Sequence, residues 1–267
     1  LTSQLAVNSA LNLPLGASLS NRYQRTTTRN WARRFDNTQG VVDGENVSFP
    51  NVSFRWNPRL GFLQRVIASF ATNADYVQTK SAEFRPSGTD APAERSGSRV
   101  RTYRITPSAV WALGGISTGA GYSLSLRDDS RPGSSNTSRT ADFNVDLGKS
   151  FAAPASWKLK PGSSVRTRLS YQASHTTGYV FSEGASSATT GGSGTGGSTT
   201  TDHSRVRLAD NGRTAINFNG ESQLADNMIG SLVFSRVVNF DEQNNRRFSQ
   251  LVFSAVLRLQ FYSGERR

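Results

Sequence analysis

Two histidines are the first residues of this 267-residue chain to consider for catalysis, because hydrolysis by a nucleophilic side chain uses a histidine close to a serine or an aspartate. His175 and His203 flank the polar stretch 176–204, and Asp202 adjoins His203. A histidine beside a stretch of this composition is ordinarily solvated rather than held against a nucleophile. We therefore predict no catalytic residues and no enzyme activity.

Acidic and glycine-rich motifs are the other candidates for chemistry. The pairs Asp128-Asp129, Asp241-Glu242, and Asp142 with Asp146 offer the carboxylates that Ca²⁺ prefers, but we interpret them as solvated turn residues and as carboxylates of a polar sheet face. The glycine-rich run 191–197 is followed by neither a Lys-Ser/Thr pair nor a helix, so it is not a phosphate loop. The absence of cysteine excludes disulfides and thiolate-bound metals. We predict no metal site and no cofactor.

The charge of the chain is strongly basic. It has 31 Lys and Arg against 19 Asp and Glu, a formal net charge of +12. A nucleic-acid-binding protein gathers such charge in one patch or run, whereas these arginines are spread over turns, loops and polar faces. Arginines near lipid phosphates or along a pore explain the charge more simply, so we predict no nucleic-acid partner.

The elements that position these residues follow a two-residue alternation. In 116–127, Ile116, Tyr122, Leu124 and Leu126 alternate with glycine, serine and Arg127, as in a strand with one apolar and one polar face. The same pattern recurs along the chain, and it predicts strands at 3–13, 17–27, 47–56, 67–78, 99–112, 116–127, 138–148, 163–175, a segment ending near 224, 228–239 and 248–261.

This alternation suits a membrane wall that has lipid on one side and water on the other. Hydrophobic residues make up only 35% of the chain and no run approaches eighteen apolar residues, so a transmembrane helix is excluded. A barrel strand needs only about 9–11 residues with every second one apolar. We predict an all-β, antiparallel up-and-down transmembrane β-barrel wall of about 11 to 12 strands, one domain over residues 1–267, either complete or part of a larger barrel.

A soluble β-sandwich also alternates and stays the alternative. Three features favour the membrane: tyrosines and tryptophans near strand ends, charged residues in the middle of polar faces, and an aromatic residue close to the last position. The side chains predicted to face lipid are Tyr23, Trp56, Tyr76, Trp111, Tyr122, Tyr171, Phe253 and Phe261. Those predicted to line the pore are Arg22, Arg55, Asp75, Arg104, Arg127, Asp142, Asp146, Arg166, Arg168, Glu221 and Arg258.

The connections predict the orientation. Short or apolar links at 14–16, 57–66, 113–115, 148–156 and 225–227 alternate with long polar links at 28–46, 79–98, 128–137, 176–204 and 240–247. Outer-membrane barrels place short turns in the periplasm and long loops outside. The C-terminus is therefore predicted to be periplasmic and the long loops extracellular, with a flexible Gly/Ser-rich loop in 176–204 and one short helical turn in 59–66.

Two features depart from a regular barrel wall. Pro107 lies within a predicted strand, which indicates a bulge or a weakly paired position. The strand number is odd, whereas single-chain bacterial barrels have even numbers. We expect either a strand that the pattern misses or, preferably, a further part of the wall.

Several short motifs resemble one family. The stretches 49–56, 62–66, 69–76, 227–237, 244–247 and 257–261 resemble the C-terminal region of the SprA family, the outer-membrane translocon of the type IX secretion system, also called a gliding-motility cell-surface protein. The resemblance implies the terminal part of a much larger barrel in the bacterial outer membrane. It also implies a protein-conducting pore with secreted passengers and with plug or gating proteins as partners. The tail 262–267 and the Gly/Ser loop depart from the family.

Two other functions remain open at this point. One is a porin-like or ligand-gated uptake barrel for small solutes, and the other is a structural barrel that binds partners at the cell surface.

Overall fold

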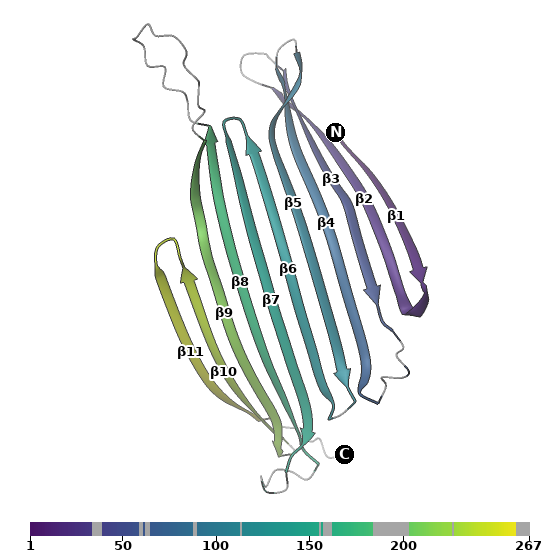
Figure 1. Ribbon diagram of the computed structural model, residues 1–267, viewed down its shortest axis with the longest axis vertical. Helices are drawn as coiled ribbons and strands as arrows, with labels where there is room; N and C mark the ends of the chain where they lie inside the picture. Colours follow the sequence, from purple (N-terminus) through teal and green to yellow (C-terminus); the bar gives the residue numbers. More distant parts are fainter. Residues whose placement is uncertain are drawn as a thin grey trace, which may run out of the picture.

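The computed structural model describes residues 1–33, 39–58, 61, 65–87, 90–112, 114–154, 156, 162–183, 203–225 and 227–259. These residues form one antiparallel sheet whose strands are ordered as in the sequence, so the predicted all-β, up-and-down fold is confirmed (Figure 1). The strands are β1 (Thr2–Leu13), β2 (Ala17–Arg33), β3 (Gln39–Trp56), β4 (Ile67–Ser87), β5 (Asp90–Trp111), β6 (Ile116–Arg131), β7 (Ser134–Ala152), β8 (Ser164–Glu183), β9 (His203–Ala225), β10 (Met228–Asp241) and β11 (Arg246–Leu259), with a 3-10 turn at Pro14–Gly16.

The strands extend further than their alternating segments. The predicted polar loops 28–46, 79–98 and 128–137 are wrong in their bounds, because most of their residues continue the ladders of β2 to β7. The predicted loop 176–204 begins too early as well, since Thr176–Glu183 belong to β8 and pair with β9. Pro132 and Gly133 alone separate β6 from β7. Polar residues predominate in the sequence of these parts, so the apolar alternation stops while backbone pairing goes on.

The short turns between the strands lie closer to their predicted positions than the long loops do. Pro14–Gly16 is a tight turn, in which Leu15 and Gly16 have φ of 62° and 73°, a region that glycine adopts without cost. The carbonyl of Gly16 accepts a hydrogen bond from the backbone N–H of Asn57 at 3.1 Å. Of the predicted helical turn at 59–66 only Gly61, Arg65 and Val66 are described, and the predicted loop 184–200 lies outside the described residues.

Pro107 occupies a weakly paired position, as predicted. It pairs with Thr72 on β4, but the β5–β6 register passes from Ile105–Tyr122 to Ser108–Gly119 without Thr106 and Pro107. Proline has no N–H to donate, so a gap in one ladder is the expected local cost.

The sheet has no hydrophobic core. Val165 and Ala215 are the only buried hydrophobic residues among those described, whereas Leu5, Phe253 and Leu257 are exposed by more than half of their surface. The soluble sandwich requires two stacked layers, but all described strands belong to one sheet. Among the described residues, no helix is long and apolar enough to cross a membrane.

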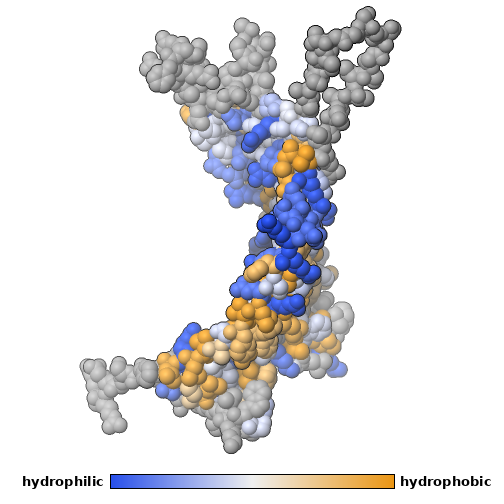
Figure 2. Space-filling view, turned by 90° about the vertical axis from the view of Figure 1, so that its left-hand side faces the viewer, coloured by the Kyte–Doolittle hydropathy of each residue, from blue (hydrophilic) through white to orange (hydrophobic). Residues whose placement is uncertain are grey.

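The strand register divides the side chains into two faces. We call them the Tyr122 face, which contains the cross-strand pairs Tyr122–Phe143 and Leu147–Leu169, and the Ser123 face, which contains Ser123–Asp142. Figure 2, seen toward the β10–β11 edge, shows a thin bent wall in which hydrophobic residues gather in the half with the short turns, while the other half is hydrophilic.

The hydrophobic half of the Tyr122 face forms a band. On β6 it runs from Ile116 to Leu126, which corresponds to roughly 33 Å along the strand and roughly 25 Å across a membrane at a 40° tilt. Lys149 on β7 and Arg236 on β10 interrupt the band, and Arg236 shares the face of Leu232 and Phe234 as predicted. Most other described strands also carry an acidic or basic residue on this face. Counted from the short-turn end, the first such residue on each of these strands is Arg25, Glu45, Lys80, Arg101, Asp128, His175, Asp210 or Arg247.

Candidate functional site

The Ser123 face collects the charged residues that the sequence singles out. Arg104 lies opposite Asp75 on one side and Ser123 on the other, and Asp142 lies opposite Ser123. The same register places Arg22, Arg55, Arg127, Asp146, Arg166, Arg168, Glu221 and Arg258 on this face. That the face lines a pore stays a prediction.

The predicted lipid-facing aromatic residues lie on the opposite side of the sheet. Tyr23, Trp56, Tyr76, Trp111, Tyr122, Tyr171 and Phe253 share the Tyr122 face, and Phe261 lies outside the described residues. Pairs such as Tyr76–Tyr103 and Trp56–Phe70 pack at ring-centroid distances of 4.7 and 5.8 Å, within the range of favourable aromatic contacts.

Some charged residues of the Ser123 face have a partner on it, which is either an opposite charge or a hydroxyl group. Arg168 donates to Asp146 from Nη2 at 2.9 Å, and Arg127 donates to Asp129 from Nε at 2.8 Å. Ser53 Oγ donates to Asp75 at 2.6 Å, and Ser123 Oγ to Asp142 at 3.1 Å. The rest form no ion pair with another described residue: Arg22, Arg55, Arg104, Arg166, Glu221 and Arg258. The face therefore carries free positive charge.

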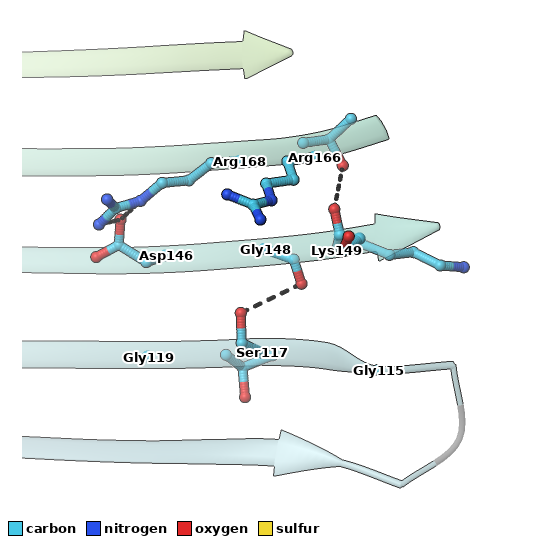
Figure 3. Close-up of a pocket in the computed structure, with 11 residues that line it drawn as sticks. Gly115, Ser117, Gly119, Asp146, Gly148, Lys149, Arg166 and Arg168 are labelled. Carbon is cyan, nitrogen blue, oxygen red and sulfur yellow. Dashed lines mark hydrogen bonds and ion pairs between the residues drawn. The ribbon is translucent and has the colours of Figure 1, made fainter. Parts of the chain in front are cut away.

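A hollow of about 450 Å³ opens on this face near the short-turn end of β6, β7 and β8 (Figure 3). Its room comes from small residues, because Gly119 on β6 and Gly148 on β7 have no side chain. A Cβ at position 148 would stand 2.6 Å from Ser117 Oγ, which itself donates a hydrogen bond to the carbonyl of Gly148. Larger residues at these positions would fill the hollow.

Two arginines of β8 border the hollow. Figure 3 shows Arg168 bound to Asp146, while the guanidinium of Arg166 lies between β7 and β8 without such a partner. Arg166 stands opposite Ser150 on β7 and Glu221 on β9. A free guanidinium beside a polar hollow can bind a carboxylate, a phosphate or a backbone carbonyl of a molecule that passes along the face.

His175 has a partner that the sequence analysis missed. Its Nε2 lies 2.7 Å from Asp210 Oδ1, and Arg207 also forms an ion pair with Asp210. Asp210 is 4% exposed, so His175 and Arg207 hold a buried carboxylate. The sequence analysis considered Asp202 as the carboxylate beside a histidine, because it adjoins His203, but Asp202 lies outside the described residues.

This cluster does not resemble a hydrolytic site. Within the described part of the chain, His175 makes no hydrogen bond to a hydroxyl group that would serve as nucleophile. Among the residues that the structure describes, no three His, Asp or Glu side chains lie close enough together to bind a metal ion. The absence of enzyme activity stays a prediction.

The last hairpin departs from the pattern of the Ser123 face. On β10 and β11 this face carries Ile229, Val233, Val237, Val252 and Val256 among polar residues, so both faces of the hairpin carry apolar side chains. Its turn is fixed by Asp241, which accepts hydrogen bonds from the side chain and backbone of Asn244 at 2.7 and 3.1 Å. These bonds lower the pKa of Asp241 below its usual value.

Comparison with known proteins identifies no family for this chain. The chain matches no family model and no curated protein, so the resemblance to the SprA family gains no support there. The solved structures that match include the beta domain of the Bordetella autotransporter BrkA, with 9% sequence identity and a TM-score of 0.32 over 97% of this chain and 90% of that one. A similarity this low establishes no shared function.

Proposed function

We propose that this chain forms the wall of a β-barrel in the bacterial outer membrane, with the apolar band of the Tyr122 face against lipid and the Ser123 face against water. The observation that carries this proposal is a single-layer sheet that leaves large hydrophobic side chains uncovered on one face, including Tyr122, Phe143 and Leu169 at 39%, 42% and 43% exposure. An uncovered apolar area of this extent marks an interaction surface. Lipid would cover a band that crosses all the strands.

The two edges of the sheet bear on how the barrel closes. β1 and β11 run in the same direction and are not paired with each other in the described residues. An open edge leaves backbone groups without hydrogen bonds, which hydrocarbon does not satisfy. Antiparallel closure of this sheet needs an odd number of additional strands, from this polypeptide or from another. We infer that further strands complete the wall.

The polar face suits the passage of polypeptide. From β1 to β9 it consists mostly of serine, threonine, asparagine, glycine and charged residues, which offer little apolar surface for an unfolded chain to bind. Together with the sequence resemblance to SprA, this supports a role in a protein-conducting translocon of the type IX secretion system. Secreted passengers and plug or gating proteins are its proposed partners, with short turns and C-terminus in the periplasm.

A passive pore for anions is the second candidate function. It is favoured by the arginines of the Ser123 face that form no ion pair with another described residue, because fixed positive charge along a pore selects anions.

Cysteine labelling tests the membrane placement, since the chain has no native cysteine. Ser123→Cys and Leu124→Cys introduce a thiol at neighbouring positions of β6 on opposite faces. In intact outer membranes, we expect a charged, water-soluble thiol reagent to modify the cysteine at 123 at least about tenfold faster than the one at 124, because hydrocarbon excludes the reagent. Equal rates at both positions would contradict the proposal.

Loss of the gene separates the two candidate functions. A translocon predicts that deletion abolishes export of surface proteins, which is measured by mass spectrometry of the culture medium. Unchanged export would exclude this role. Anion-selective conductance of the purified protein in planar bilayers, with normal export in the deletion strain, would establish the passive pore instead.

A further inference from the structure

A second hollow, of about 470 Å³, lies on the Tyr122 face where the apolar band ends on β4 and β5. Moving away from the short turns along this face, the paired rings of Tyr76 and Tyr103 are followed by Gln78 and Arg101 and then by Lys80 and Arg99 at the hollow. Its small lining residues are Ala82, Gly97 and Ser130, and its long side chains are Lys80, Arg99, Glu45 and Asp128.

The charges in this hollow are not balanced. Lys80 stands directly opposite Arg99 on the neighbouring strand, and like charges in such positions destabilise a sheet. The two acidic residues already have cationic partners, because Arg25 Nε lies 2.7 Å from Glu45 Oε1 and Arg101 Nη2 lies 2.8 Å from Asp128 Oδ2.

Lys80 and Arg99 themselves form no ion pair with another described residue. Asp128 stands opposite Arg99 on β6 but is paired with Arg101, so Lys80 and Arg99 face each other without an ion pair of their own and define the place for an anion from outside. A phosphate group fits best, because the guanidinium presents a fork of donors to its oxygens and the ammonium supplies a second charge.

We propose that Lys80 and Arg99 bind a phosphate group of a phosphorylated lipid of the outer leaflet. The lipid, rather than free phosphate, follows from position: the hollow adjoins the end of the apolar band, where acyl chains give way to headgroups. This step rests on the proposed function, since it uses the membrane to cover the band. The acyl chains would then lie along the apolar residues below Tyr76 and Tyr103.

Native mass spectrometry of the full chain in detergent micelles tests this, with diphosphoryl lipid A as the probe. The double variant Lys80→Gln/Arg99→Gln removes both cations, and the control Arg22→Gln/Arg55→Gln removes the same charge from the Ser123 face. We expect the double variant to bind the probe at least about tenfold more weakly, which corresponds to about 1.4 kcal/mol, and the control to bind as the parent does. Equal binding by the parent chain and the Lys80/Arg99 variant would overturn the proposal.

Further arms identify the source of the phosphate and guard against misfolding. Lipid A without phosphates should bind the parent chain as weakly as diphosphoryl lipid A binds the variant, and inorganic phosphate at equal concentration should not displace the probe. Displacement by inorganic phosphate would show a site for the free ion and overturn the lipid assignment. The variant Lys80→Arg/Arg99→Lys keeps both charges and should retain binding, whereas its failure to bind would contradict a site made by these two positive charges.

Failure here is distinct from failure of the proposed function. If the cysteines at 123 and 124 label as expected but lipid binding does not depend on Lys80 and Arg99, only the lipid site is wrong. If both cysteines label equally, the membrane placement is wrong, whatever the micelle experiment shows.

Discussion

Replacing Leu169 with arginine is expected to destabilise the folded protein in a bilayer by about 2–4 kcal/mol, the cost of an arginine on the lipid side of a barrel near the midplane. Leu169 lies within the apolar band, opposite Leu147 and Phe218, and is 43% exposed. The charge would have to leave water for hydrocarbon at a position from which a side chain reaches neither interface easily. Urea unfolding in lipid vesicles measures the change.

Ser170→Arg is the matched control, because it puts the same side chain at the next position of β8 but on the Ser123 face. We expect a change of less than about 0.5 kcal/mol, since the new charge stays in water and faces Asp146. If the arginine at 169 is tolerated as well as the one at 170, or makes the protein dissolve without detergent, the band does not face lipid.

Replacing Asp210 with alanine is expected to loosen the β8–β9 hairpin beyond the apolar band. Asp210 is buried and joins His175 on β8 to Arg207 on its own strand. Its loss removes the ion pair with Arg207 and the hydrogen bond with His175, together worth about 1–3 kcal/mol, and leaves both side chains without their shared partner. Hydrogen exchange of the peptides that contain Thr176–Glu183 should become about tenfold faster.

Asp142→Ala provides the comparison for this change. Asp142 is exposed on the Ser123 face, and its side chain accepts one hydrogen bond, from Ser123. Its removal should leave exchange in both β8 and β9 unchanged. Equal exchange in the two variants would show that the His175–Asp210–Arg207 cluster does not hold the hairpin together.

The fold was predictable where one face of a strand is apolar. In β6 the alternation from Ile116 to Leu126 gives both the strand and its orientation in the sheet. It fails beyond Leu126, where Arg127, Asp128 and Asp129 continue the strand with polar side chains on both faces. Such residues also occur in loops, so only backbone pairing with β5 and β7 distinguishes the two cases.

The clusters of charged side chains depend on the register between strands, which cannot be read from the composition of the strands. Arg168 and Asp146 were both predicted to share the polar face, and their contact follows from the β7–β8 register. Asp210 was not singled out, because it reaches His175 through a long hairpin whose register shifts at Gly178/Tyr179. A one-residue slip in that hairpin would turn Asp210 to the opposite face. The hollow at Lys80 and Arg99 likewise joins residues of four strands.

Each strand of this sheet pairs only with its neighbours in the sequence. The sheet is therefore built by adding one strand beside the next, and among the described strands no crossover connects distant parts. Gene duplication or loss of two adjacent strands would therefore change the circumference of the wall while leaving every other pairing intact. The same construction allows pores of different diameter to evolve from one ancestral unit.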